Sequence, residues 1–230
     1  MDTQNIWFLE NIDVTGIFCP TKMESRDSSS THVDKQYKKG DYIYLPNEHS
    51  NKIYLINKGR VKIGKVSESN KEITKVILSK GELFGELSLI GQGKRTDYAQ
   101  AMEETTVCIL SREEMTSLLK EHNSFYLYIM NIMGNRTLAI EKRLESLVFK
   151  DSRSRIIEFL LDLNTKKGER VGYEWVVRKF LTHQEIANFT ATSRQTVTTV
   201  LNELKGKNLL TFNRKRLLLR DIDKIKNEIA

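Results

Sequence analysis

LTHQEIANFTATSRQTVTTVLNEL, residues 181–204, decides the architecture of the C-terminal part of this chain. Thr182 and Glu185 have the T-x-x-E spacing of a capping box, which predicts that a helix begins there. The apolar pattern then breaks, and Ser193 is a good N-cap for a second helix because its hydroxyl can accept from backbone N–H groups two or three residues on. The stretch therefore predicts two short helices separated by a tight turn.

The second predicted helix has an apolar face and an open polar face. Val197, Val200, Leu201 and Leu204 recur at the three- and four-residue spacing of a buried stripe. The polar residues from Arg194 onward fall elsewhere on the helix. This is the layout of a helix-turn-helix, in which Arg can read guanine, Gln can read adenine and a Thr methyl can touch a thymine methyl. The alternative is an ordinary helical hairpin with a solvated polar face.

Two apolar runs follow, at 209–212 and 217–219, around the basic turn 213–216. This pattern predicts a β-hairpin. A helix-turn-helix followed by such a hairpin is a winged helix, whose basic tip would add affinity for the phosphate backbone without sequence information. The residues expected to contact DNA are Thr182, His183, Gln184, Ser193, Arg194, Gln195, Thr196, Thr198, Thr199, Arg214 and Lys215.

The positive charge of the chain is concentrated in this part. Residues 150–230 contain 17 Lys and Arg against 10 Asp and Glu, whereas residues 1–149 contain 20 of each. A basic part beside a neutral part is typical of a nucleic-acid module attached to a regulatory module. The simpler interpretation of a charge excess is a soluble surface.

Length and composition limit the remaining choices. A chain of 230 residues fits two domains of common size. Neither a membrane-spanning stretch nor a signal peptide is expected. The two cysteines, Cys19 and Cys108, are far apart, form no disulfide framework and suit a reducing cytoplasm, where we expect the protein to act.

The N-terminal part is predicted to be β-rich. Short alternating runs with turn residues between them predict strands at 42–45, 52–56, 60–63, 74–78 and 106–110. Strands at this spacing indicate a barrel or a sandwich.

A long helix is predicted over residues 111–149, with a break near His122. Its second part has an apolar seam at alternating three- and four-residue steps, the pattern of a two-stranded coiled coil. The seam comprises Met130, Met133, Thr137, Ile140, Leu144 and Leu147. It predicts a homodimer, and the alternative is packing against the chain's own domain.

The order of these parts resembles the CRP/FNR family of bacterial transcription regulators. The resemblance runs from about Gln36 to Leu219 and rests on stretches 39–43, 56–62, 84–89 with 94–96, 147–151 with Arg155 and Ile156, and 193–197. It implies an α+β fold: an effector-sensing β-roll of the cyclic-nucleotide-binding, jelly-roll kind over 1–121, a dimerisation helix and hinge over 122–149, and a winged helix-turn-helix over 150–230. The implied partners are double-stranded DNA bound at a palindromic operator, a second copy of the chain and, for an activator, RNA polymerase.

The resemblance also implies an effector cassette. By matching the family's motif, Gly85, Glu86, Arg95 and Thr96 would supply backbone N–H groups, a ribose-binding carboxylate, a phosphate-binding guanidinium and a hydroxyl to a cyclic nucleotide such as cyclic AMP. The remaining positions implied for the effector site are Leu87, Thr137, Ile140 and Glu141.

Several residues depart from the family's pattern. Lys94 stands where a proline is often found, and Asp97 and Tyr98 stand where small residues are usual. In the second interpretation no cofactor binds, Glu86 and Arg95 form an internal pair, and the regulator is constitutive or obeys another effector.

Other effectors and functions have less support in the sequence. An iron–sulfur cluster would need further N-terminal cysteines, and the four histidines lack the spacing of metal or haem ligands. No catalytic residues are expected, because G-x-S-x-G, P-loop and H-E-x-x-H motifs are missing. A weaker alternative is an architectural protein that binds DNA without sequence preference.

Overall fold

The computed structural model describes residues 33–229 except 92 and 214, together with residues 16 and 18. The chain divides into two compact units, Met1–Thr137 and Leu138–Ala230. None of the helices formed by the described residues combines the length and apolar character that crossing a bilayer requires.

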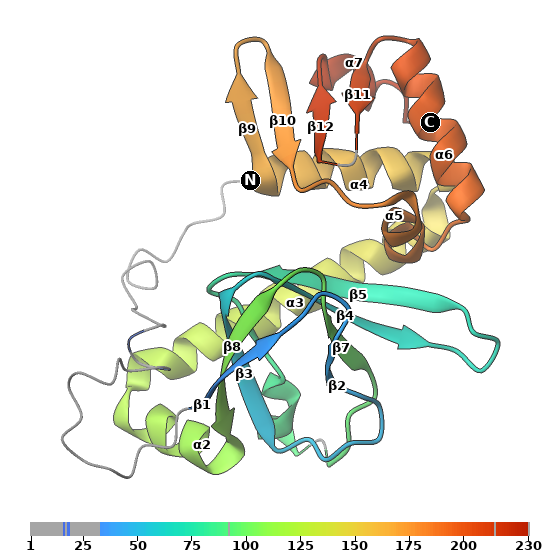
Figure 1. The fold of residues 1–230 in the computed structure, drawn as a ribbon. Helices are drawn as coiled ribbons and strands as arrows, with labels where there is room; N and C mark the ends of the chain where they lie inside the picture. Colours follow the sequence, from blue (N-terminus) through green and yellow to red (C-terminus); the bar gives the residue numbers. More distant parts are fainter. Residues whose placement is uncertain (1–15, 17, 19–32, 92, 214, 230) are drawn as a thin grey trace. The chain divides into compact units, whose positions relative to one another are not determined.

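Two four-stranded antiparallel sheets form the first unit (Figure 1), with strand orders β1-β8-β3-β6 and β2-β7-β4-β5. The strands are β1 Val33–Tyr37, β2 Tyr42–Tyr44, β3 Lys52–Lys58, β4 Arg60–Val66, β5 Glu72–Ser79, β6 Leu83–Phe84, β7 Tyr98–Ala101 and β8 Thr105–Ser111. A short 3₁₀ helix, η1 Glu86–Ile90, follows β6.

Strand β3 illustrates how the roll is packed. Successive side chains of a strand point to opposite faces, so Ile53 and Leu55 share one face while Tyr54 and Ile56 share the other. Tyr54 and Ile56 join a core cluster that contains residues of both sheets. Ile53 and Leu55 join a second cluster with the helices that follow β8. Both faces of β3 are covered, which explains its uninterrupted apolar run.

The long helix predicted over 111–149 is present as two helices, α2 Arg112–Glu121 and α3 Asn123–Phe149. The predicted break falls at His122, the C-cap of α2. Ser111 caps α2 through a capping box with Glu114. In the first unit, Phe125 and Ile129 of α3 pack into the second core cluster.

The second unit contains the end of α3 and a helical domain with a small sheet of order β11-β12-β10-β9 (Figure 1). Its other elements are α4 Ser152–Lys167, β9 Gly168–Val171, β10 Glu174–Arg178, α5 His183–Thr190, α6 Arg194–Gly206, β11 Leu210–Phe212, β12 Arg216–Leu219 and α7 Ile222–Lys226. The hairpin predicted around 213–216 is the β11–β12 pair.

The predicted strands are present with ends that differ by a few residues, and further strands were not predicted. In the roll these are β1, β6 and β7, and in the second unit they are β9 and β10. Most are short or alternate charged with apolar residues, so their local sequence resembles loops. They become strands because each pairs with a neighbouring strand of its sheet: β9 pairs with β10, and β10 also pairs with β12.

One expectation about the cysteines is wrong. Cys108 is a fully buried core residue of β8, as expected, but it is disulfide-bonded. Cys19 lies outside the described residues. Separation along the sequence conceals such a bond, which needs only that two Cα atoms approach within about 7 Å.

Candidate nucleic-acid interface and effector cassette

Helices α5 and α6 form the predicted helix-turn-helix, and both predicted caps are present. Thr182 Oγ1 accepts from the backbone N–H of Glu185 at 3.2 Å, and Glu185 Oε2 accepts from the backbone N–H of Thr182 at 2.7 Å. Ser193 Oγ accepts from the N–H of Thr196 at 3.0 Å. These bonds satisfy N–H groups that the first turn of each helix leaves without partners.

The turn between the helices is tight because Ala191 adopts a left-handed conformation, with φ of 52°. Two arginines hold the end of α5 beside it. Arg143 of α3 donates to the carbonyl oxygen of Phe189, and Arg155 of α4 donates from Nε to the carbonyl oxygen of Thr190 at 3.1 Å. These carbonyls belong to the last turn of a helix, where cations and donors are favoured.

The predicted DNA contacts on α6 fall into two groups. Arg194, Gln195 and Thr199 are exposed and make no side-chain hydrogen bond to any described residue. The hydroxyls of Ser193 and Thr196 bond each other at 2.8 Å. Arg194, Gln195 and Thr199 are therefore not engaged by the described part of the chain, while Ser193 and Thr196 build the start of the helix.

The predicted contacts at the start of α5 are also partly engaged within the protein. Gln184 Nε2 donates to Asn188 Oδ1 at 2.7 Å, and the Thr182 hydroxyl donates to Glu185 Oε2 at 2.9 Å. His183 is half-buried and reaches α6, where its Nδ1 lies 2.8 Å from Thr198 Oγ1. Its ring also meets the Phe212 ring of β11 edge-on, with centroids 5.4 Å apart.

The tip of the wing is organised by Asn213. Its Oδ1 accepts from the backbone N–H groups of Lys215 at 2.8 Å and Arg216 at 3.0 Å. The side chain of Lys215 is exposed and forms no ion pair with a described residue. Arg214, the other predicted contact on the wing, lies outside the described residues.

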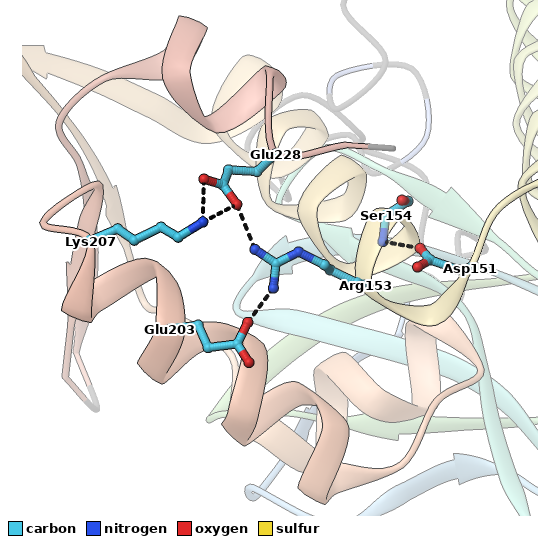
Figure 2. Close-up of polar contacts among 6 residues, drawn as sticks. All are labelled: Asp151, Arg153, Ser154, Glu203, Lys207 and Glu228. Carbon is cyan, nitrogen blue, oxygen red and sulfur yellow. Dashed lines mark hydrogen bonds and ion pairs between the residues drawn. The ribbon is translucent and has the colours of Figure 1, made fainter.

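Helix α6 is tied to the rest of its unit by a cluster of four charged side chains, which Figure 2 shows converging from different elements. Arg153 of α4 pairs with Glu203 of α6 and, at 2.6 Å, with Glu228 after α7. Lys207 completes the cluster with bonds of 2.7 Å to both oxygens of Glu228. The same view shows the N-cap of α4, where Asp151 Oδ1 accepts from the N–H of Ser154 at 2.7 Å.

The residues predicted to form the effector cassette of the first unit lie at Gly85, in η1 and at Arg95. Gly85 has φ of 83°, and a Cβ there would come within 2.8 Å of the carbonyl oxygen of Lys52, so only glycine fits. Arg95 is buried, and its guanidinium lies 4.5 Å from the ring centroid of Tyr44. It donates to the carbonyl oxygens of Gly85, at 3.2 Å, and of Lys52. Its Nε has no partner in the described part of the chain.

The expected internal pair between Glu86 and Arg95 is wrong. Glu86 is buried and forms its ion pair with Arg136 of α3 instead. Arg136 also donates to the carbonyl oxygen of Leu83. The physical reason is that a buried carboxylate needs a charged partner, and the Arg95 guanidinium is already held by backbone carbonyls. Nothing in the sequence marks Arg136 as the partner of Glu86.

Two of the residues that depart from the family's pattern, Asp97 and Tyr98, have side-chain partners within the roll. Asp97 pairs with Lys75 at 2.8 Å, and the hydroxyl of Tyr98 bonds Glu72. Thr96 is exposed and Leu87 is half-buried. The negative charge of Asp97 is therefore balanced by Lys75.

The three positions implied on the long helix are exposed. Thr137 donates its hydroxyl to the carbonyl oxygen of Met133 at 3.0 Å, within its own helix. Ile140 and Glu141 are exposed residues of the second unit. Among the described residues there is also no group of three or more His, Cys, Asp or Glu that could hold a metal ion.

The apolar seam of α3 divides along its length. Met133 packs against the second core cluster of the first unit. Met130, Ile140, Leu144 and Leu147 are exposed, at 68%, 68%, 61% and 41%. Met133 of the seam therefore packs on the roll, whereas Met130 before it and the apolar seam residues from Ile140 onward are uncovered.

Comparisons with known proteins match both units. The model of a cyclic nucleotide-binding domain matches residues 34–122, and that of a Crp-like helix-turn-helix domain matches residues 154–228. The global nitrogen regulators of Synechococcus elongatus and Synechocystis sp. are 32% and 31% identical, over 80% of this chain and 83% of theirs. The structure of a CooA mutant from Carboxydothermus hydrogenoformans has a TM-score of 0.77 and 28% identity, covering 99% of this chain and 96% of that one.

Proposed function

Because this chain belongs to the CRP/FNR family of transcription regulators, we propose that it is a homodimer that binds a palindromic DNA operator sequence-specifically. The observation that carries the proposal is the first half of α6. There Arg194, Gln195 and Thr199 are exposed and make no side-chain hydrogen bond to the described residues, while Ser193 and Thr196 hold the start of the helix.

The exposed part of the α3 seam supports the dimer. Ile140, Leu144 and Leu147 follow one another at the steps of a coiled-coil interface, and water covers them in a single chain. A helix-turn-helix dimer reads two half-sites about one helical turn of DNA apart, which is why the operator is proposed to be palindromic.

Two hypotheses remain for the roll. In the first, a cyclic nucleotide binds at Gly85, Glu86 and Arg95, and shifts the balance between two states of the dimer. In the second, the cassette is structural and regulation comes from another effector or from abundance. The second is favoured by the pairing of Glu86 with Arg136 and by the bonds from Arg95 to two backbone carbonyls, since a nucleotide would have to displace them.

The experiment that tests the function is selection of binding sites from random duplex DNA, followed by titration of the selected duplex at fixed salt. Enrichment of a two-fold symmetric site would support the proposal, and enrichment of no sequence would contradict it. The same titration with cyclic AMP or cyclic GMP separates the two hypotheses for the roll. A tighter complex with either nucleotide supports a ligand site, and unchanged affinity supports a structural cassette.

A further inference from the structure

His183 joins three elements of the proposed DNA-binding unit. It is the first residue of α5, its Nδ1 lies 2.8 Å from Thr198 Oγ1 on α6, and its ring meets that of Phe212 on β11. The Thr198 hydroxyl is in turn 2.9 Å from the carbonyl oxygen of Arg194, to which it donates.

This chain of hydrogen bonds determines where the histidine carries its proton. The Thr198 hydroxyl has one hydrogen, and a carbonyl oxygen can only accept, so that hydrogen is directed at Arg194. Thr198 Oγ1 must therefore accept in its contact with His183, and Nδ1 must be the donor. A neutral ring has only one N–H, so Nε2 then carries a lone pair.

The Nε2 atom of the half-buried ring is not fully buried. It forms no hydrogen bond with a described residue, and it is not among the buried atoms that lack a partner. An Nε2 with a lone pair repels an anion, whereas a protonated Nε2 donates a charge-assisted bond to one.

We infer that His183 makes the DNA affinity of the winged helix dependent on protonation: Nδ1–H is fixed on Thr198, so Nε2 can bind a DNA phosphate only in the imidazolium. This inference rests on the proposed function, because it requires that α5 approaches the DNA backbone. It goes further by assigning to His183 a proton that is taken up when DNA binds.

The surroundings of the ring determine the direction in which the pKa of His183 is shifted in the free protein. The positive charge of Arg194 on α6 acts on the ring, and Lys205 on the same helix lies over the Phe212 ring, 5.7 Å from its centroid. On α5, Glu185 is directed at Thr182 by its capping bonds. Burial, and secondarily the positive charge of Arg194, lower the pKa of His183 below its ordinary value in the free protein.

A phosphate next to Nε2 acts in the opposite sense and raises the pKa in the complex. A group whose pKa rises on binding takes up a proton, so DNA affinity increases as the pH falls through the pKa of the complex. Each unit of that rise is worth up to about tenfold in affinity per histidine.

The test is titration of a fluorescein-labelled duplex carrying the selected site, at fixed salt, between pH 5.5 and 8.5. His183→Asn is the informative variant because its amide nitrogen stands near the position of Nδ1, so it can still donate to Thr198 but cannot titrate. His49→Asn, which removes an exposed histidine of the roll, is the matched control. Circular dichroism establishes that both variants are folded.

We expect the wild type and His49→Asn to bind about tenfold or more tightly at pH 5.5 than at 8.5, and His183→Asn to show a much flatter profile. A wild-type slope in His183→Asn would overturn the inference. Calorimetry of the wild type at pH 6.5, in two buffers of different protonation enthalpy, tests it without a variant, and release or absence of protons contradicts it. If the wild-type protein binds the duplex at no pH in this range, the result would instead contradict the proposed function.

Discussion

The guanidinium of Arg143 caps the last turn of α5 through Phe189, donating to its carbonyl oxygen at 2.5 Å and lying 4.8 Å from the centroid of its ring. One residue of α3 thus joins a backbone acceptor and an aromatic face of the helix-turn-helix. Burial lowers the pKa of this arginine below its ordinary value, and it remains charged at neutral pH.

Replacing Arg143 with Met should therefore destabilise the second unit by about 1.5–3 kcal/mol, the usual worth of a hydrogen bond to a charged group. The measurement is urea unfolding followed by circular dichroism. Lys142→Met, which changes an exposed neighbour on the same helix, is the control and should stay close to the wild type. Equal stability of the two variants would mean that the cap contributes nothing.

The buried pair between Glu86 and Arg136 should be coupled. Glu86→Gln leaves a mostly buried guanidinium without its counter-charge and should cost about 3–5 kcal/mol of roll stability. Arg136→Met combined with Glu86→Gln should cost less than the sum of the two single changes. A double-mutant cycle by urea unfolding measures this coupling, and additive losses would show that the pair does not interact.

Ala191, in the turn between α5 and α6, should tolerate glycine better than Ala187 inside α5. Its φ of 52° is costly for a residue with a Cβ, so Ala191→Gly should stabilise the protein by about 0.5–1 kcal/mol, net of the greater freedom of glycine in the unfolded chain. Ala187→Gly, inside α5, should lower stability by about 1 kcal/mol. Thermal unfolding distinguishes the two, and a lower Tm for Ala191→Gly would contradict the prediction.

The contribution of Glu228 should depend on pH. Its bonds to Lys207 and then Arg153 lower its pKa, so its stabilising effect is complete above the unfolded pKa of a glutamate and is lost as the pH falls through the folded value. At pH 7, Glu228→Gln should cost about 1 kcal/mol, in keeping with a partly exposed network. Urea unfolding should show that the difference in unfolding free energy between Glu228→Gln and the wild type shrinks toward pH 3. A difference that stays constant with pH would show that the charge of Glu228 is not its cause.

Arg194 and Lys215 should differ in how they affect DNA binding. Arg194→Ala should cost about 1–3 kcal/mol and relax the preference at one base position. Lys215→Ala should weaken binding to all sequences alike and flatten the dependence on salt. Binding to single-base variants of the selected site at several salt concentrations separates these effects. An unchanged preference after Arg194→Ala would exclude that residue from base reading.

The helix-turn-helix was predictable because its signals are local. The capping residues Thr182 and Ser193 act on N–H groups within three residues, and the apolar stripe of α6 repeats within one helix. The break at His122 and the β11–β12 hairpin are local in the same sense. The sequence therefore predicts these elements from interactions between near neighbours.

The partners of the cassette were not predictable in this way. Glu86 and Arg136 are 50 positions apart, and nothing in the sequence distinguishes Arg136 from the other cations of the helix before the roll is folded. Arg95 matched the family's motif, yet its bonds to Gly85 and Lys52 depend on how β3 and η1 come together. Pairings of this kind follow from topology and burial, which local patterns do not contain.

The exposed apolar side chains of α3 have a consequence for the amount of protein. If Ile140, Leu144 and Leu147 are covered by a second copy, association stabilises the fold, and that stabilisation grows with chain concentration. A dilute chain would leave these side chains in water and spend more time open to proteases. The protein would then be degraded quickly when its rate of synthesis is low and would accumulate when that rate is high. In this way α3 sets the lowest concentration at which the protein is stable against proteolysis.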